Sequence, residues 1–334
     1  MATSKRQQIV LSEAAPIFLR FIETHRSPNT RDSYAYILKA FIAHVNDLPI
    51  NSVRAEDVED FLYTMRHTPF NANRGAATGE TLKYRKPKTI ANMHIALSSF
   101  WSWATQRGYA KKDIMNAIPI TKVYPEPVDP LTDVELSNLL RACVRSREYR
   151  SKADVTNLRV TSERDRAIIA LLAETAIRVT EAANLRIGDV TFEPGQAGGS
   201  IRVILGKGGK SRIVPFSRRC GGWLKEYMAL RHASGEDEWL FVVTKGRSSG
   251  RQMDRKSIRR IIVGLGQRIG IHANPHRLRT TAACMMLQNG MGIYDLQRIM
   301  GHNDLKTTRR YIAAARVDLA LAMKKHSPLD NIRL

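Results

Sequence analysis

Apolar residues recur every three or four positions along most of the chain, which is the period of an amphipathic helix. In the first part this pattern predicts four helices, which begin near Leu11, Pro28, Ala55 and Pro87. Ser27 directly before Pro28 is typical of a helix start, because the serine oxygen can cap the first turn. We expect these helices to share one apolar core and to form a small all-helical domain.

A proline-rich run over residues 111–130 separates this part from the rest. Proline at this density cannot continue a helix, so the run is interpreted as a linker. The sequence Leu131-Thr132-Asp133 then offers an N-cap for the first helix of a second domain. The polar stretches 67–86 and 144–162 are predicted to be long loops.

The second part adds a short β-structure to the helical pattern. Residues 201–205 and 211–215 are rich in β-branched side chains and flank a Gly-Lys-Gly-Gly-Lys turn, which predicts a hairpin, and residues 190–192 could add a third strand. Ser162 and Asp165 resemble a capping box at the start of a helix, and the chain after the hairpin is mostly helical in pattern. The predicted fold class is therefore mainly α with a small antiparallel β-sheet.

The net charge of the chain indicates which kind of molecule it binds. Lys and Arg number 53 against 31 Asp and Glu, so the formal net charge is +22. This excess favours nucleic acid as the partner, the alternative being a basic surface without a specific partner. No apolar run is long enough to span a membrane or to form a signal peptide. The three cysteines are far apart, which fits a reducing cytoplasm rather than a disulfide scaffold.

Four separate stretches carry candidate chemistry, centred on Arg178, on the basic hairpin tip 206–215, on His276 with Arg279, and on His302 with Tyr311. Arg178 lies at a predicted break between two helices, where its guanidinium can point at an external anion. His276 and Arg279 are three positions apart and share one face of a helix. Tyr311 follows His302 by nine residues.

These stretches, in this order and with this spacing, resemble the tyrosine recombinase family, which includes the phage integrases and the Xer-like site-specific recombinases. Each motif is weak alone, but the four together are specific, and the resemblance covers most of the chain. It implies a helical core DNA-binding domain with a SAM-like fold over residues 1–110 and the linker over 111–130. Residues 131–334 would form a mixed α+β catalytic domain with a C-terminal tail.

The resemblance also implies a reaction, the cleavage of DNA by transesterification. Tyr311 would attack the scissile phosphate and form a 3′-phosphotyrosyl bond, so neither ATP nor a cofactor nor a metal is expected. Tyr294 lacks the family spacing and is the alternative nucleophile. Arg178 and Arg279 would bind the non-bridging oxygens, where negative charge develops in the transition state.

The remaining catalytic roles are also implied by the resemblance. Lys207 would be the general acid that protonates the leaving 5′-oxygen, with Lys210 as a rival three residues on. His276 and His302 would hydrogen-bond the phosphate and help to move protons. Glu181 would orient an arginine or a histidine of the site.

Basic residues outside this catalytic set are candidate DNA contacts: Lys83, Arg85, Lys86, Lys88, Lys210 and Arg212. The four that precede the fourth helix could instead be ordinary solvated charges. After Arg279 the family usually has a histidine, whereas this chain has Thr280, which predicts different local hydrogen bonding.

The implied function is site-specific DNA recombination for integration, excision or resolution. Expected partners are duplex DNA with a specific site and further copies of the chain in a tetramer, with a second recombinase as a conceivable hetero-partner and no membrane. The expected location is the cytoplasm, at the nucleoid. The alternatives are a type IB topoisomerase-like enzyme, an inactive recombinase fold that regulates by binding DNA, and a histidine-dependent metal hydrolase. No carboxylate-rich ligand cluster accompanies the histidines, which weakens the last alternative.

Overall fold

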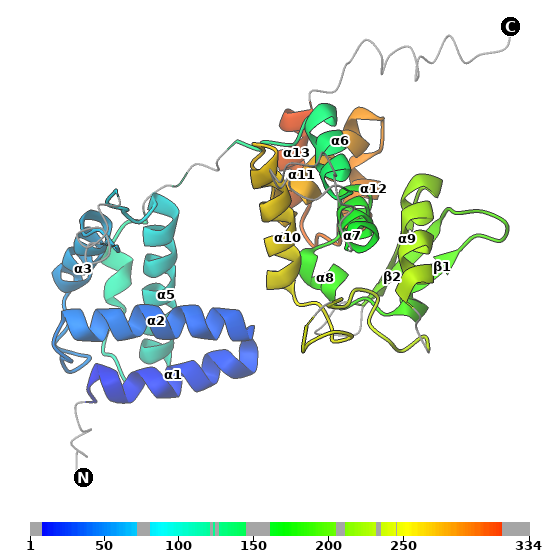
Figure 1. The fold of residues 1–334 in the computed structure, drawn as a ribbon. Coiled ribbons are helices and arrows are strands. Elements are labelled where there is room, and N and C mark those ends of the chain that lie inside the picture. The colour runs from blue at the N-terminus through cyan, green and yellow to red at the C-terminus, as the bar shows by residue number, and fades with distance from the viewer. Residues whose placement is uncertain are drawn as a thin grey trace, which may run out of the picture. The chain divides into compact units, whose positions relative to one another are not determined.

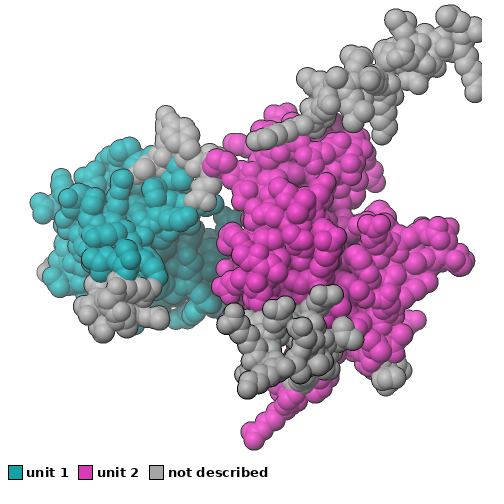
Figure 2. Space-filling model, turned by 45° about the horizontal axis from the view of Figure 1, so that its top comes forward, with its two compact units in different colours: residues 1–125 teal, residues 126–334 magenta. Residues whose placement is uncertain are grey.

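The computed structural model describes residues 9–71, 81–120, 123, 127–144, 161–204, 211–231, 235–244 and 246–315. These residues are mainly helical with one three-stranded antiparallel sheet, as predicted (Figure 1). The chain divides into two compact units, residues 1–125 and 126–334, coloured separately in Figure 2. None of the described helices is long and apolar enough to cross a membrane.

The described helices of the first unit are α1 (Leu11–His25), α2 (Pro28–His44), α3 (Ala55–His67), α5 (Pro87–Gln106) and the 3-10 helix η1 (Ile114–Ala117). The four predicted helices are confirmed, and Ser27 caps α2 by accepting a hydrogen bond from the N–H of Thr30 at 3.3 Å. The core is aromatic, with Phe18, Phe41, Phe61, Phe100 and Trp101 all fully buried. Ile114 and Met115 pack into the same core, so this part of the expected linker is structurally part of the first unit.

The described elements of the second unit are α6 (Asp133–Ala142), α7 (Ser162–Thr175), α8 (Val179–Ala183), η2 (Ile187–Asp189), β1 (Val190–Phe192), β2 (Gly199–Ile204), β3 (Ser211–Phe216), α9 (Arg218–Arg231), α10 (Arg255–Arg268), α11 (Pro275–Gln288), α12 (Ile293–Met300) and α13 (Leu305–Ala315). Thr132 caps α6 through the N–H of Glu135 at 3.2 Å, as the sequence predicts. Helix α7 lies in the centre of the unit and is buried along most of its length (Figure 1).

The predicted hairpin and third strand are confirmed. The strand order is β1-β2-β3, and Ile201 of β2 faces Val214 of β3 in the antiparallel register. Val214 and Phe216 are buried, so the alternation of a strand places Arg212 on the same, covered face. The turn at residues 205–210 lies outside the described residues.

One expectation for the second unit is wrong. Ser162 does not cap α7, because the helix begins at this residue and Thr161 precedes it. Asp165 is instead fully buried, where it accepts a hydrogen bond from Arg164 at 2.7 Å. The helical pattern after the hairpin holds for α9 to α13, but residues 235–254 form turns and isolated bridges among their described positions.

Candidate active site

A sharp turn between α7 and α8 presents Arg178. Helix α7 ends with the fully buried Ala176 at φ 51°, a left-handed conformation that is uncommon for a residue with a Cβ atom. Arg178 then becomes the N-cap of α8, with 44 % of its side chain exposed. The predicted break between two helices at this arginine is therefore confirmed.

Glu181 holds two arginines together at this turn. Its side chain is 9 % exposed and accepts hydrogen bonds from Arg178 Nη1 at 2.9 Å and from Arg212 Nη2 at 2.8 Å. Burial alone would raise the pKa of Glu181, but the hydrogen bonds from Arg212 and Arg178 outweigh it and hold this pKa below its ordinary value. Glu181 is thus an ionised carboxylate between two cations.

The end of α12 orients two arginines that come from different elements. Gly301 adopts φ 63° and ends the helix, which leaves its last carbonyl groups without partners inside the helix. Arg212 Nε donates to the carbonyl of Ile299 at 2.7 Å, and Arg279 Nη2 donates to that of Met300 at 2.9 Å. A helix C-terminus carries partial negative charge and favours such cations.

Arg279 is the most deeply buried cation of the site, with 5 % of the residue exposed. It also donates a hydrogen bond to the carbonyl of Ala176 in the turn before Arg178. Burial, followed by the positive charge of Arg178, lowers the pKa of Arg279 to about 10. Arg279 therefore stays protonated at neutral pH, close enough to Arg178 for the two charges to repel. An anion bound between them would relieve this repulsion.

His302 is held in the neutral state beside these arginines. Its Nε2 lies 2.9 Å from Arg279 Nη2, and its Nδ1 lies 2.9 Å from Oγ1 of the fully buried Thr308. Arginine can only donate, so Nε2 accepts and Nδ1 carries the proton toward the threonine. Burial and then the charge of Arg279 lower the pKa of His302 to about 4, which agrees with this geometry.

Tyr311 lies against His302 with nearly parallel rings, whose centroids are 6.3 Å apart. It belongs to α13 and is 2 % exposed, packed in an apolar cluster with Cys284 and Met300. The alternative nucleophile Tyr294 is 68 % exposed on α12. Of the two tyrosines considered as nucleophile, Tyr311 is therefore the one that lies next to His302.

The structure describes only part of the remaining predicted site. Lys207 and Lys210 lie outside the described residues. His276 is exposed in the first turn of α11, whereas Arg279 on the same helix is buried. Arg212 was expected on a DNA-contacting surface, but its side chain is only 11 % exposed and is bound to Glu181.

The other candidate DNA contacts are in the first unit. Lys83, Lys86 and Lys88 are exposed. Arg85 instead donates to the carbonyl of Met65 at 3.2 Å and so anchors its own loop. No group of three or more His, Cys, Asp or Glu side chains in the described part of the chain could hold a metal ion.

The sequence did not reveal that Arg212 is a partner of Glu181 or that Thr308 is a partner of His302. Arg212 could have been placed on the buried face of its strand, because it alternates with Val214 and Phe216. Thr308 gave no such signal, because its contact with His302 depends on how α13 packs after the turn.

The chain matches two family models. Residues 139–317, more than half of the chain, match the phage integrase family, and residues 18–108 match the phage integrase N-terminal SAM-like domain. It is 30 % identical over 328 residues to the tyrosine recombinase XerA of Pyrococcus furiosus, covering 98 % of each chain. It is 27 % identical to the tyrosine recombinase XerC of Proteus mirabilis, covering 90 % of this chain and 89 % of that one.

Solved structures share the fold. The XerH site-specific recombinase bound to its palindromic difH substrate has a TM-score of 0.66 at 18 % identity, covering 96 % of this chain and 85 % of that one. A lambda integrase tetramer bound to a Holliday junction has a TM-score of 0.65 at 14 % identity, covering 92 % and 78 %. These likenesses agree with the mainly helical fold and its small sheet. By its match to the family model and to its curated relatives, the chain belongs to the phage integrase family of tyrosine recombinases.

Proposed function

We propose that this protein is a site-specific DNA recombinase that cleaves and rejoins DNA through a phosphotyrosyl intermediate on Tyr311. The observation that carries the proposal is the placement of Tyr311 against His302, which also contacts the buried Arg279. A nucleophile, a neutral imidazole and two cations around one turn suit attack on a phosphodiester.

The arginines would stabilise the transition state. Arg178 offers a partly exposed guanidinium. The guanidinium of Arg279 is held in place by hydrogen bonds to the carbonyl groups of Ala176 and Met300. Both can bind the non-bridging oxygens in bidentate geometry as charge develops on them. Glu181 would position Arg178 without touching the DNA.

The tyrosine must reach the phosphate before it can react. Because Tyr311 is 2 % exposed, attack by its hydroxyl requires α13 to shift so that the phenol leaves the apolar cluster. Tyr311 Oη would pass its proton to a histidine of the site and form a bond to phosphorus, while the bond from phosphorus to the 5′-oxygen breaks and that oxygen takes up a proton. Lys207 is the residue we propose as the donor of that proton, with His276 as a further phosphate contact.

The proposed partner is duplex DNA with a specific recombination site. The basic residues Lys83, Lys86 and Lys88, in a first unit that we propose as the core DNA-binding domain, would contact phosphates. The relative XerA and the XerH complex support this assignment, and the lambda integrase tetramer supports assembly of four copies on DNA. Location at the nucleoid and a second recombinase as hetero-partner belong to the same proposal.

Covalent capture in cells tests the proposal on whichever DNA site the protein selects. Wild type, Tyr311→Phe and the control Tyr294→Phe would be expressed, purified under denaturing conditions, and any attached DNA sequenced. We expect an adduct at one sequence from wild type and Tyr294→Phe, and none from Tyr311→Phe. DNA binding without an adduct from any variant would favour a regulator instead. A recovered site that supports relaxation of supercoils but no strand exchange would favour a topoisomerase.

A further inference from the structure

Residues 128–131, which lead into α6 and are called the entry segment below, are fastened to the start of α11. Thr281 Oγ1 accepts a hydrogen bond from the N–H of Leu131 at 2.8 Å and itself donates to the carbonyl of Arg277 at 2.8 Å. Thr281 is fully buried, and Leu131 is 2 % exposed. This attachment therefore belongs to the packed interior of the second unit and is not a surface contact.

Arg277 makes a second attachment in the first turn of the same helix. Its Nε donates to the carbonyl of Asp129 at 3.1 Å, and its Nη2 donates to that of Pro130 at 3.4 Å. Nη2 also lies 3.0 Å from the carboxylate of Asp129 and 3.8 Å from that of Glu135, and Nη1 donates to the carbonyl of His272 at 2.6 Å. The side chain is 12 % exposed, and all three guanidinium nitrogens have protein acceptors, so we do not assign Arg277 to a DNA phosphate.

The same turn of α11 is held on another side by the candidate active site. Arg279, two positions after Arg277, donates to the carbonyl of Met300 at 2.9 Å. Residues two apart on a helix do not face each other, so the two arginines fasten α11 to different neighbours. Val128 of the entry segment also packs against the apolar cluster that contains Tyr311. The entry segment thus contacts both the helix that presents Arg279 and the surroundings of the nucleophile.

We propose that Arg277 is a positioning residue for DNA cleavage, which sets the position of Arg279 by fastening α11 to the entry segment. The proposal rests on the proposed function, because it requires that Arg279 binds the scissile phosphate. Loss of the Arg277 contacts frees one side of the first turn of α11, so that Arg279 shifts relative to the phosphate. A misplacement of about 1 Å can slow a reaction by about 100-fold. Arg277 thus acts on the rate of cleavage without touching the DNA.

Single-turnover cleavage of the DNA site recovered by covalent capture tests this role, with the full-length protein at saturating concentration. Arg277→Gln removes the guanidinium, and Thr281→Val removes the other attachment without a change of charge. We expect each variant to cleave slower than wild type by roughly tenfold or more, with unchanged DNA affinity. Arg277→Lys keeps the charge and one donor group, so its rate should lie between those of wild type and Arg277→Gln. Should Arg277→Gln fail to fold, Arg277→Lys and Thr281→Val decide the question.

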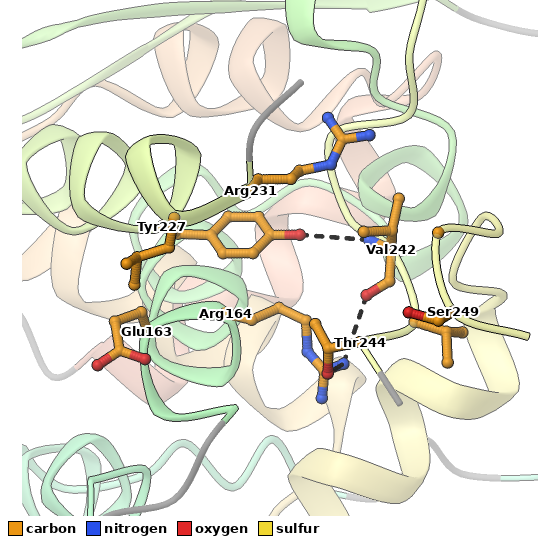
Figure 3. A pocket seen from close by; sticks show the side chains of 10 residues that line it. Glu163, Arg164, Tyr227, Arg231, Val242, Thr244 and Ser249 are labelled. Carbon is orange, nitrogen blue, oxygen red and sulfur yellow. Dashed lines mark hydrogen bonds between the residues drawn. The ribbon is translucent and has the colours of Figure 1, made fainter. Parts of the chain in front are cut away.

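Thr244→Val is the matched control for Thr281→Val. Thr244 Oγ1 accepts a hydrogen bond from Arg164 at 3.0 Å and so helps to fasten a different segment to α7 (Figure 3). Thr244 lines a cavity at the start of α7, whereas the turn that presents Arg178 follows the end of this helix. Both threonine variants should lower the melting temperature, but only Thr281→Val should slow cleavage. A role of the entry segment in stability alone would leave both variants with the wild-type rate.

The outcomes separate this positioning role from the proposed function. A wild-type cleavage rate in folded Arg277→Gln or in Thr281→Val would overturn the positioning role and leave the proposed function standing. The same would follow if Thr244→Val slowed cleavage as much as Thr281→Val, because the loss would then report only on stability. Absence of a covalent adduct from wild type would refute the proposed function and, with it, a role of Arg277 in cleavage.

Discussion

Arg279 Nη2 lies 2.9 Å from His302 Nε2, and this contact acts with burial to keep the histidine neutral. Because an arginine only donates, the imidazole accepts at Nε2 and donates from Nδ1 to Thr308. A phosphate that takes over the Arg279 donor would leave His302 Nε2 facing the reacting groups. In the proposed mechanism, the arginine would thus prepare the histidine for proton transfer.

Mild acid should destabilise the protein through His302. The pKa of His302 falls from its ordinary value of 6.5 to about 4 in the folded chain. The unfolded chain binds the proton more tightly in this window, so the free energy of unfolding decreases as the pH falls from 6.5 toward 4. Measured by urea unfolding, the free energy of unfolding should fall more steeply with decreasing pH in wild type than in His302→Gln. The exposed His272→Gln variant should keep the wild-type slope, and a shared slope for all three would contradict the prediction.

Thr308 should matter for cleavage although it touches no substrate. Thr308→Val removes the acceptor of His302 Nδ1–H, and we expect the single-turnover cleavage rate to fall by about tenfold, the cost of one hydrogen bond. DNA affinity should not change. Thr307→Val alters the exposed neighbour and should cleave like wild type. An unchanged rate in Thr308→Val would show that this contact does not orient the histidine.

Arg212 should stabilise the fold through its buried contacts. Arg212→Met leaves the buried Glu181 with one cation fewer and the Ile299 carbonyl without its donor. We expect a loss of roughly 2–4 kcal/mol in the free energy of unfolding, measured by urea denaturation. Arg219→Met, at an exposed position of α9, should cost no more than about 0.5 kcal/mol. Equal values for the two variants would contradict a structural role for Arg212.

The sequence predicted those features that depend on local patterns. The helix starts at Ser27 and Thr132 follow from capping chemistry, and Arg178 at the end of α7 follows from the break in the apolar period. The Ser162–Asp165 capping box was wrong because α7 begins one residue earlier than the box requires: Thr161 is the N-cap, and Asp165 bonds to its neighbour Arg164.

The geometry of the site depends on contacts between distant segments. Arg212 reaches Glu181 across 31 positions, and Arg279 reaches the end of α12 across 21. These pairings follow from how β3, α11 and α12 pack, and no period in the sequence encodes them. The identities of the site residues could therefore be proposed from motifs, but not their partners.

Substitution of Gly301 should destabilise the protein by more than its backbone conformation alone explains. An added Cβ would lie 2.8 Å from Arg212 Nη1, and the residue has φ +63°. Gly270 has φ +70° and no atom within 4 Å of an added Cβ, so Gly270→Ala carries the conformational cost alone, about 1–2 kcal/mol. Gly301→Ala should cost roughly 1–2 kcal/mol more by urea denaturation and should also slow cleavage. An equal loss of unfolding free energy in the two variants would show that Arg212 can move aside without destabilising the protein.

The identity of the nucleophile is the central claim, and mapping the covalent bond tests it most directly. The adduct captured from wild-type protein would be digested with nuclease and protease, and the peptide that retains a nucleotide would be sequenced by mass spectrometry. We predict the nucleotide on the phenolic oxygen of Tyr311, the tyrosine that lies against His302. A nucleotide on Tyr294 or on any other residue would contradict the account.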